Sequence, residues 1–240
     1  MKRTAVILLC LMYLCIIKAQ PAITFTPTWT PQAQFAGYYA AIEKGYFKEE
    51  GLNVRIKHLK VGSKKTACDM LIDGETDIVS ISLMKAIQMR DQGLKLVNVL
   101  QASQNTGLMC VSTHKLTDLS QLNGKTVGTW KAGYREIAEF AFTDKNINIK
   151  WIPFLQGMNL FVAKAVDATL CYNYNEYIQL IMAKGHIPKE NCINFSDIGY
   201  NFPEDGIYVT EDEEFVFQQI HLKNCFFNIH RFHISCKNNS

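Results

Sequence analysis

The sequence predicts an α/β protein of two lobes with a ligand cleft between them. Strands and helices alternate along most of the chain, and two small polar stretches, near residues 105 and 198, interrupt the alternation. Alternating strands and helices favour a parallel sheet covered by helices. Two such lobes joined by two crossings leave a cleft at the carboxyl ends of the strands, where ligands bind in open α/β sheets.

The first lobe begins with a short apolar strand that ends before Pro27. Its three predicted helices end at Gly45, Gly74 and Gly93, because glycine is the usual residue just beyond a helix. Apolar and polar residues alternate most clearly in the second strand, as expected for a half-buried strand. The predicted strands are 23–25, 53–59, 77–81 and 96–101, and the predicted helices are 34–44, 63–73 and 84–92.

The second lobe repeats this pattern. The polar stretch 103–107 predicts one crossing between the lobes, and residues 196–200 predict the return crossing. We therefore assign residues 20–103 and 200–215 to the first lobe and residues 104–199 to the second. The predicted strands of the second lobe are 108–112, 126–129, 149–152 and 168–171, and the predicted helical segments are 119–122, 134–143, 160–164 and 175–184.

The chain begins with the pattern of a secretory signal peptide. Lys2 and Arg3 precede an uncharged apolar run, residues 5–17, and Ala19 is a small residue at a possible cleavage site. The apolar run is short for a membrane span, although its retention as an anchor stays open. We assign residues 1–19 to a signal peptide and expect an exported, periplasmic or extracytoplasmic protein.

The last part of the chain, residues 216–240, follows neither a strand period nor a helix period and contains no turn signals. We expect an atypical tail there, following a chain cut short at its C-terminal end. A genuine surface tail is the alternative.

Charge and cysteine content bear on the class of function. The 240 residues include 25 basic and 22 acidic side chains. Removal of Lys2, Arg3 and Lys18 with the signal peptide leaves a neutral chain, so bulk charge gives no support for nucleic-acid binding. Six of the eight cysteines remain, and their irregular spacing favours buried thiols over disulfides. No CxxC or HxxxH spacing is present, so a metal site is not expected.

Aromatic residues near the first strand are candidates for binding a flat ligand. Trp29 lies in a proline-stiffened loop after that strand, where its indole can stack on a planar ring. The alternative is an aromatic plug that packs against the next helix. Tyr38, on that helix, projects a phenol either into the same cleft or into the core.

Two turns of the second lobe offer polar groups. The turn 128–133 places glycines and free amides at the start of a helix, which suits an anion or a carbonyl. Polar and aromatic residues gather at 172–177, after a strand. Within this segment, Glu176 either accepts hydrogen bonds from an amino group on a ligand ring or only places a favourable charge at a helix start.

No motif in the sequence predicts catalysis. The chain lacks a GxSxG turn, a Walker loop, an HExxH pair and a dinucleotide-binding glycine fingerprint. None of its six histidines is paired with a nucleophile. A binding protein without a cofactor fits these observations better than an enzyme.

Several segments together resemble one known group of proteins. The longest is 29–54, which contains an aromatic loop, a helix that starts with glycine and an aromatic residue, and two short acidic and glycine motifs. Those motifs and the further matches are Glu43-Lys-Gly-Tyr-Phe47, Glu50-Gly-Leu-Asn-Val54, Asp73-Gly-Glu-Thr-Asp77, Leu122-Asn-Gly-Lys-Thr-Val-Gly128, Gly157-Met-Asn159 and Val166-Asp-Ala168. As a set they resemble the ABC-transporter substrate-binding proteins of the sulfonate, nitrate and thiamine-pyrimidine group, over roughly residues 22–214. Trp29 and Gly157-Met-Asn159 make the chain most similar to the pyrimidine-precursor binders and the related pyrimidine synthases.

The resemblance implies the type II periplasmic-binding fold, with two lobes that close on a ligand. It implies a small aminopyrimidine as the ligand, an ABC permease as the membrane partner and uptake of a thiamine precursor as the role. We expect the protein to be a monomer. By position, the cleft residues implied by the family are Trp29, Tyr38, Ser82, Leu83, Trp130, Gly133, Asn159 and Glu176.

The chain departs from the family pattern in two places. The synthase branch uses a lysine and a histidine in the segment after Asp77, whereas no histidine occurs between His58 and His114. The helices that usually follow residues 208–210 are also missing. The alternatives to a solute-binding protein are a pyrimidine synthase-like enzyme and a ligand-sensing input module that signals to a partner.

Overall fold

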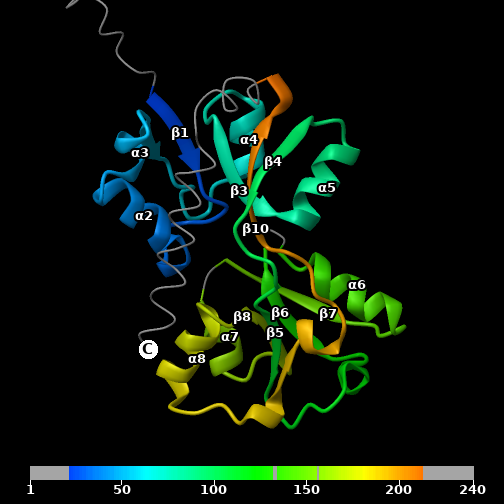
Figure 1. Cartoon of the computed structure of the whole chain (residues 1–240). Coiled ribbons are helices and arrows are strands. Elements are labelled where there is room, and N and C mark those ends of the chain that lie inside the picture. The colour runs from blue at the N-terminus through cyan, green and yellow to red at the C-terminus, as the bar shows by residue number, and fades with distance from the viewer. Residues whose placement is uncertain (1–21, 132–133, 156, 213–240) are drawn as a thin grey trace, which may run out of the picture.

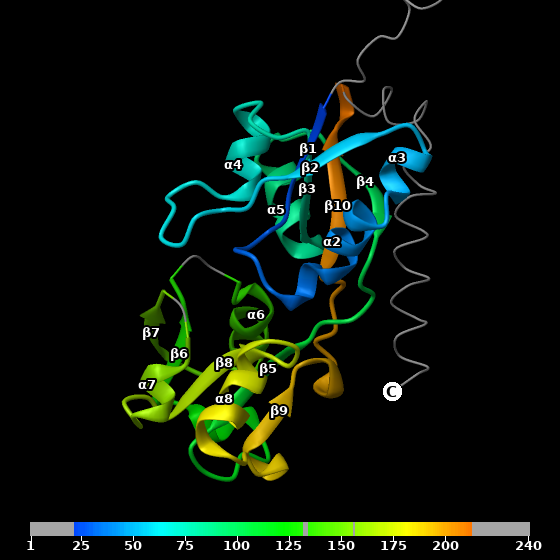
Figure 2. The same ribbon diagram turned by 90° about the vertical axis from the view of Figure 1, so that its left-hand side faces the viewer.

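The computed structural model describes residues 22–131, 134–155 and 157–212. In this part of the chain, two five-stranded sheets form two lobes that lie one above the other (Figures 1 and 2). Two segments cross between the lobes, as the sequence predicts. The residues assigned to the signal peptide and to the atypical tail lie outside the described ranges.

The first lobe is built on a mixed sheet. Its strands are β1 (Ala22–Thr26), β2 (Asn53–Ile56), β3 (Ile78–Ser82), β4 (Leu96–Gln101) and β10 (Asp205–Thr210). Its helices are η1 (Ala33–Phe35), α2 (Ala36–Glu43), α3 (Tyr46–Glu49), α4 (Ala67–Ile72) and α5 (Leu83–Asp91). The strand order is β2-β1-β3-β10-β4, in which β1 is parallel to β2 and β3, whereas β10 is antiparallel to both of its neighbours.

Helices cover both faces of this sheet, with α2 and α3 on one side and α4 and α5 on the other (Figure 1). Alternation along β3 explains the two layers, since Ile78 packs with Phe25 and Phe35 on the α2 side and Val79 packs on the α4 side. Thr66 begins α4 with a capping box, in which its hydroxyl accepts a hydrogen bond from the Asp69 backbone N–H.

The second lobe repeats this architecture with the sheet order β7-β6-β8-β5-β9. Its strands are β5 (Leu108–Ser112), β6 (Thr126–Trp130), β7 (Lys150–Phe154), β8 (Ala168–Tyr172) and β9 (Cys192–Asn194). Its helices are η2 (Leu119–Leu122), α6 (Glu136–Asp144), α7 (Asn159–Val162), α8 (Glu176–Lys184), η3 (Lys189–Asn191) and η4 (Ser196–Ile198). Helix α6 packs on one face of the sheet, and α7 and α8 pack on the other.

Both sheets differ from the expected parallel arrangement in the same way. Strand β5 is antiparallel to β8 and β9, just as β10 is antiparallel to β3 and β4. Each of these strands follows a crossing. It therefore begins at the end of its sheet that faces the other lobe and runs away from that lobe. The sequence analysis assigned no strand to the segments that form β9 and β10.

The cysteines that the structure describes are free thiols, as the sequence predicts. Cys68, Cys110 and Cys171 are buried, and Cys192 is half-buried. Burial raises the pKa of Cys68 to about 11 and that of Cys110 to about 12, which keeps both thiols protonated near neutral pH. Within the described ranges, no helix has the length and apolar character that a membrane crossing requires.

Candidate functional site

The two sheets point their strand ends at a cleft between the lobes. Residues at or just after the carboxyl ends of β1, β3, β6 and β8 line this cleft, together with the first residue of β10. The cleft measures about 470 Å³ and is partly open to solvent. Its position at strand ends is typical of a small-molecule site in an α/β protein.

A row of aromatic rings forms the wall that the second lobe contributes. The rings of Trp130 and Tyr172 have centroids 5.2 Å apart, and Tyr172 stacks on Tyr174 at the same separation, with 17° between the ring planes. Trp130 ends β6, and Tyr172 ends the neighbouring strand β8, so the sheet itself sets their spacing. These rings give the cleft an apolar, flat surface.

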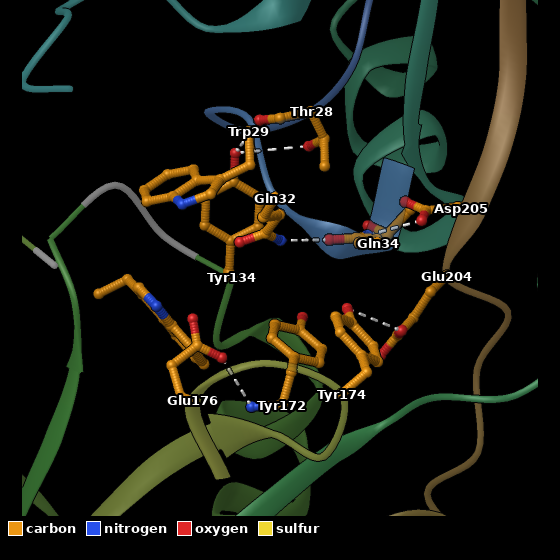
Figure 3. Close-up of a pocket in the computed structure, with 12 residues that line it drawn as sticks. Thr28, Trp29, Gln32, Gln34, Tyr134, Tyr172, Tyr174, Glu176, Glu204 and Asp205 are labelled. Carbon is orange, nitrogen blue, oxygen red and sulfur yellow. Dashed lines mark hydrogen bonds between the residues drawn. The ribbon is translucent and has the colours of Figure 1, made fainter. Parts of the chain in front are cut away.

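The first lobe contributes Trp29 from the loop after β1. Its indole meets the ring of Tyr134 edge to face, with centroids 5.2 Å apart. Figure 3 shows both rings on the opposite side of the cleft from Tyr172 and Tyr174. Trp29 is half-buried, so part of the indole remains available to a ligand.

Glu176 lies at one end of the aromatic row and is 6% exposed. Its carboxylate accepts hydrogen bonds from the backbone N–H of Tyr172 at 3.1 Å and from the side-chain amide of Asn175 at 3.0 Å. The Trp130 side chain also favours the ionised form of this carboxyl and so lowers its pKa. Burial raises the pKa of Glu176, while these donors oppose the rise by stabilising the ionised form.

Glu204 and Asp205 lie at the other end, where the return crossing enters β10 (Figure 3). One Glu204 oxygen accepts hydrogen bonds from the hydroxyl of Thr106 at 2.6 Å and from the N–H of Gly107 at 2.8 Å. The phenol of Tyr174 donates to the other oxygen at 3.3 Å. Burial raises the pKa of Glu204 to about 7, with a further contribution from the neighbouring Asp205.

Asp205 accepts a hydrogen bond of 2.6 Å from the side-chain amide of Gln34. Burial raises the pKa of its carboxyl, and the bond from Gln34 opposes that rise. The cleft therefore contains three carboxyl groups, and none of the residues described as lining it is a lysine, an arginine or a histidine. No group of side chains suited to holding a metal ion occurs among the described residues.

Hydrogen bonds connect the two lobes across the cleft. The phenol of Tyr134 donates to the backbone carbonyl of Thr28 at 2.8 Å. The amide of Asn175 donates to the side-chain oxygen of Gln32 at 2.9 Å. Together with Trp29 against Tyr134, these contacts hold the cleft-lining loops of the two lobes beside each other.

The structure brings together half of the residues that the sequence analysis assigned to the site. Trp29, Ser82, Trp130 and Glu176 all line the cleft. Gly133 lies outside the described residues.

Three of the assigned residues lie elsewhere. Tyr38 is in the core of the first lobe, 6% exposed, with its ring centroid 4.8 Å from that of Phe25, because this face of α2 packs on the sheet. Leu83 is half-buried at the start of α5, where its N–H donates to the carbonyl of Pro203 at 3.2 Å. Asn159 begins α7 and is exposed to solvent, outside the cleft lining.

Several cleft residues were not assigned from the sequence. Glu204 and Asp205 are the most important, and the only available signal was a pair of acidic residues directly after the return crossing. Gln32 and Gln34 belong to the loop that carries Trp29, and Tyr172 and Tyr174 belong to the polar and aromatic segment that carries Glu176.

Comparison with known proteins places the chain in a family. The sequence profile of NMT1/THI5-like proteins matches residues 32–216, which span most of both lobes and all of the strand ends that line the cleft after β1. The chain belongs to the NMT1/THI5-like family.

Individual relatives of this NMT1/THI5-like chain are distant. It is 32% identical over 153 residues to YtlA, a candidate binding protein of Bacillus subtilis (strain 168). The matched region covers 61% of this chain and 44% of YtlA. It is 24% identical over 205 residues to the riboflavin-binding protein RibY of Chloroflexus aurantiacus. This matched region covers 80% of this chain and 57% of RibY. The chain thus spans about half the length of these curated relatives.

Solved structures show the fold. The periplasmic aliphatic sulphonate-binding protein SsuA of Escherichia coli superposes with a TM-score of 0.63 at 13% identity, over 91% of this chain and 71% of SsuA. The expected periplasmic-binding fold, with two α/β lobes and a cleft, is therefore confirmed.

Proposed function

We propose that this NMT1/THI5-like chain is an exported solute-binding protein of an ABC transporter. It captures a small aminopyrimidine, a thiamine precursor, in the cleft between its lobes and presents it to a membrane permease. The observation that carries the proposal is the pairing of flat aromatic surfaces with a buried carboxylate, Glu176, in one cleft.

The two kinds of group suit the two parts of an aminopyrimidine. A pyrimidine ring can stack on the half-buried indole of Trp29, because every flat heteroaromatic ring offers a face for stacking. An ionised Glu176 accepts hydrogen bonds and donates none, so it matches an exocyclic amino group.

The charge of the cleft argues against anionic ligands. A sulfonate or nitrate placed there would meet Glu176, Glu204 and Asp205 without a basic side chain from the described lining. Like charges at close range are unfavourable, and they are less screened in a buried site than in water. The fold shared with SsuA therefore does not transfer sulfonate binding to this protein.

Binding rather than catalysis is supported by the relatives, which are named as binding proteins. Export is supported by the signal-peptide pattern of residues 1–19. We retain the division into a first lobe of residues 20–103 and 200–215 and a second lobe of residues 104–199 as part of the proposal. The protein acts as a monomer that closes on its ligand.

Isothermal titration calorimetry on the full chain tests the proposal. We expect 4-amino-2,5-dimethylpyrimidine to bind, whereas taurine and nitrate produce no heat beyond dilution. Riboflavin serves as a second flat ligand, chosen because of the similarity to RibY. A clear signal from taurine or riboflavin, with none from the pyrimidine, contradicts the proposed ligand.

A further inference from the structure

The aromatic row of the cleft has a carboxylate at each of its two ends. Glu176 accepts a hydrogen bond from the N–H of Tyr172 at one end, and Glu204 accepts one from the phenol of Tyr174 at the other. Between them, Trp130, Tyr172 and Tyr174 follow one another at 5.2 Å separations. Figure 3 shows Glu176 on one side of the two tyrosines and Glu204 with Asp205 on the other.

Neither carboxylate has all of its acceptor positions filled. Glu176 accepts hydrogen bonds from the N–H of Tyr172 and from the side chain of Asn175. At the opposite end, one oxygen of Glu204 has two short bonds, but its other oxygen has only the 3.3 Å contact with Tyr174. A carboxylate oxygen can accept two hydrogen bonds, so this second oxygen has capacity for another donor.

Among the residues that the structure describes, no positive charge lies at the Glu204 end. The titratable groups that face Glu204 are Asp205 on its own segment and Tyr172 and Tyr174 on the β8–α8 connection, and no cation is among them. Its remaining described partners, Thr106 and Gly107, are neutral groups on the first crossing. A buried carboxyl beside a half-buried one, without a cation, is costly to ionise, and a positively charged ligand group would relieve that cost.

We propose that the ligand is a flat ring with hydrogen-bond donors at opposite ends, one of which is a protonated amine held by Glu204 and Asp205. This inference rests on the proposed aminopyrimidine function and narrows its ligand class. Glu176 takes the neutral ring amino group, because it lacks a second carboxyl of the kind that Asp205 places beside Glu204. Glu204 and Asp205 select the cationic substituent and act as specificity-determining residues.

The test compares two pyrimidines that differ at one end. The diamine 2-amino-5-aminomethylpyrimidine carries a protonated amine across the ring from its ring amino group, and 2-amino-5-methylpyrimidine has a methyl group in its place. Calorimetry on the full chain is expected to show roughly tenfold tighter binding of the diamine, as for a hydrogen bond between charged groups. Glu204→Gln removes the charge at nearly constant shape, and we expect it to abolish this preference while the monoamine loses less than about threefold.

Two further variants control for structure. Glu190→Gln makes the same change at an exposed position on η3, and it should leave both affinities unchanged. Asp205→Asn tests the same end of the cleft if Glu204→Gln unfolds, because an asparagine oxygen can still accept the bond from Gln34. Thermal melts of all variants show which of them are folded.

Proton release provides a second readout. At pH 7, close to the pKa of about 7 for Glu204, binding of the diamine should release a fraction of a proton, since the ligand cation favours the ionised carboxylate. Titrations in two buffers of different ionisation enthalpy measure this release, which Glu204→Gln should reduce. A purely structural role of Glu204 would not produce that difference.

The outcomes separate the two proposals. Wild-type protein that binds both pyrimidines equally, or a Glu204→Gln variant that retains the preference, overturns the two-ended ligand but leaves the aminopyrimidine function standing. Wild-type protein that binds neither pyrimidine contradicts the aminopyrimidine function, and the inference falls with it.

Discussion

Replacement of Trp29 by alanine is expected to weaken aminopyrimidine binding by roughly 5- to 150-fold, or about 1 to 3 kcal/mol, the usual contribution of a base stacked on an aromatic side chain. The indole is half-buried beside Tyr134 and lines the cleft. Calorimetry measures the loss, and quenching of tryptophan fluorescence provides a second signal, since Trp29 and Trp130 both line the cleft.

Conservative variants separate stacking from packing. Trp29 also packs against the cores of both lobes, so its removal can affect folding as well as binding. Trp29→Phe retains a ring and should lose less affinity than Trp29→Ala. Trp151→Phe makes the matched change on β7, where the indole packs under Arg135 instead of lining the cleft, and it should leave binding unchanged. A folded Trp29→Ala variant with wild-type affinity rules out the stacking role.

Glu176→Gln is expected to weaken binding of 4-amino-2,5-dimethylpyrimidine by roughly 10- to 150-fold, because a hydrogen bond to a charged group contributes about 1.5 to 3 kcal/mol. Glutamine keeps the size of the side chain and one acceptor oxygen, so it can still accept the bond from the Tyr172 N–H. The change removes the charge and also the bond from Asn175, because the new amide NH2 cannot accept it, so thermal melts must show that the variant is folded. Calorimetry against Glu190→Gln, an exposed site, provides the comparison.

The pH dependence of this pair gives an independent check. Burial raises the pKa of Glu176, and protonation turns the carboxylate into a poorer acceptor. Wild-type affinity for the monoamine should therefore fall as the pH is lowered through that pKa. The ratio of wild-type to Glu176→Gln affinity cancels the titration of the ligand itself. A ratio that stays constant from neutral to acidic pH contradicts the assigned role of Glu176.

Much of the fold was predictable from local patterns. Short apolar runs predicted the strands, and glycines predicted the helix ends, so the order of most elements in both lobes followed from the sequence. The polar stretch before β5 predicted the first crossing. The antiparallel placement of β10 between β3 and β4 was not predictable, because it depends on where the chain re-enters the first sheet. The four residues of α3 were also missed, since so short a segment shows no clear helical period.

The candidate site was predictable where a residue follows a strand directly. Trp29 and Glu176 lie in the short segments that follow β1 and β8, and strand ends in an open α/β sheet meet at one edge. Tyr38 could not be placed in this way, because the choice between cleft and core depends on how α2 is rotated against Phe25 and Phe35. Glu204 and Asp205 join the cleft only through the return crossing, which brings residues far apart in sequence together.

A crystal structure of the full chain with 2-amino-5-aminomethylpyrimidine tests the central claim most directly. The account predicts that the pyrimidine lies between the lobes, with its ring centroid about 4.5 to 7 Å from that of the Trp29 indole. It also predicts the ring amino group on a Glu176 oxygen and the aminomethyl group on Glu204. Density for the ligand outside the cleft, or a ring that contacts neither Trp29 nor Glu176, would contradict it.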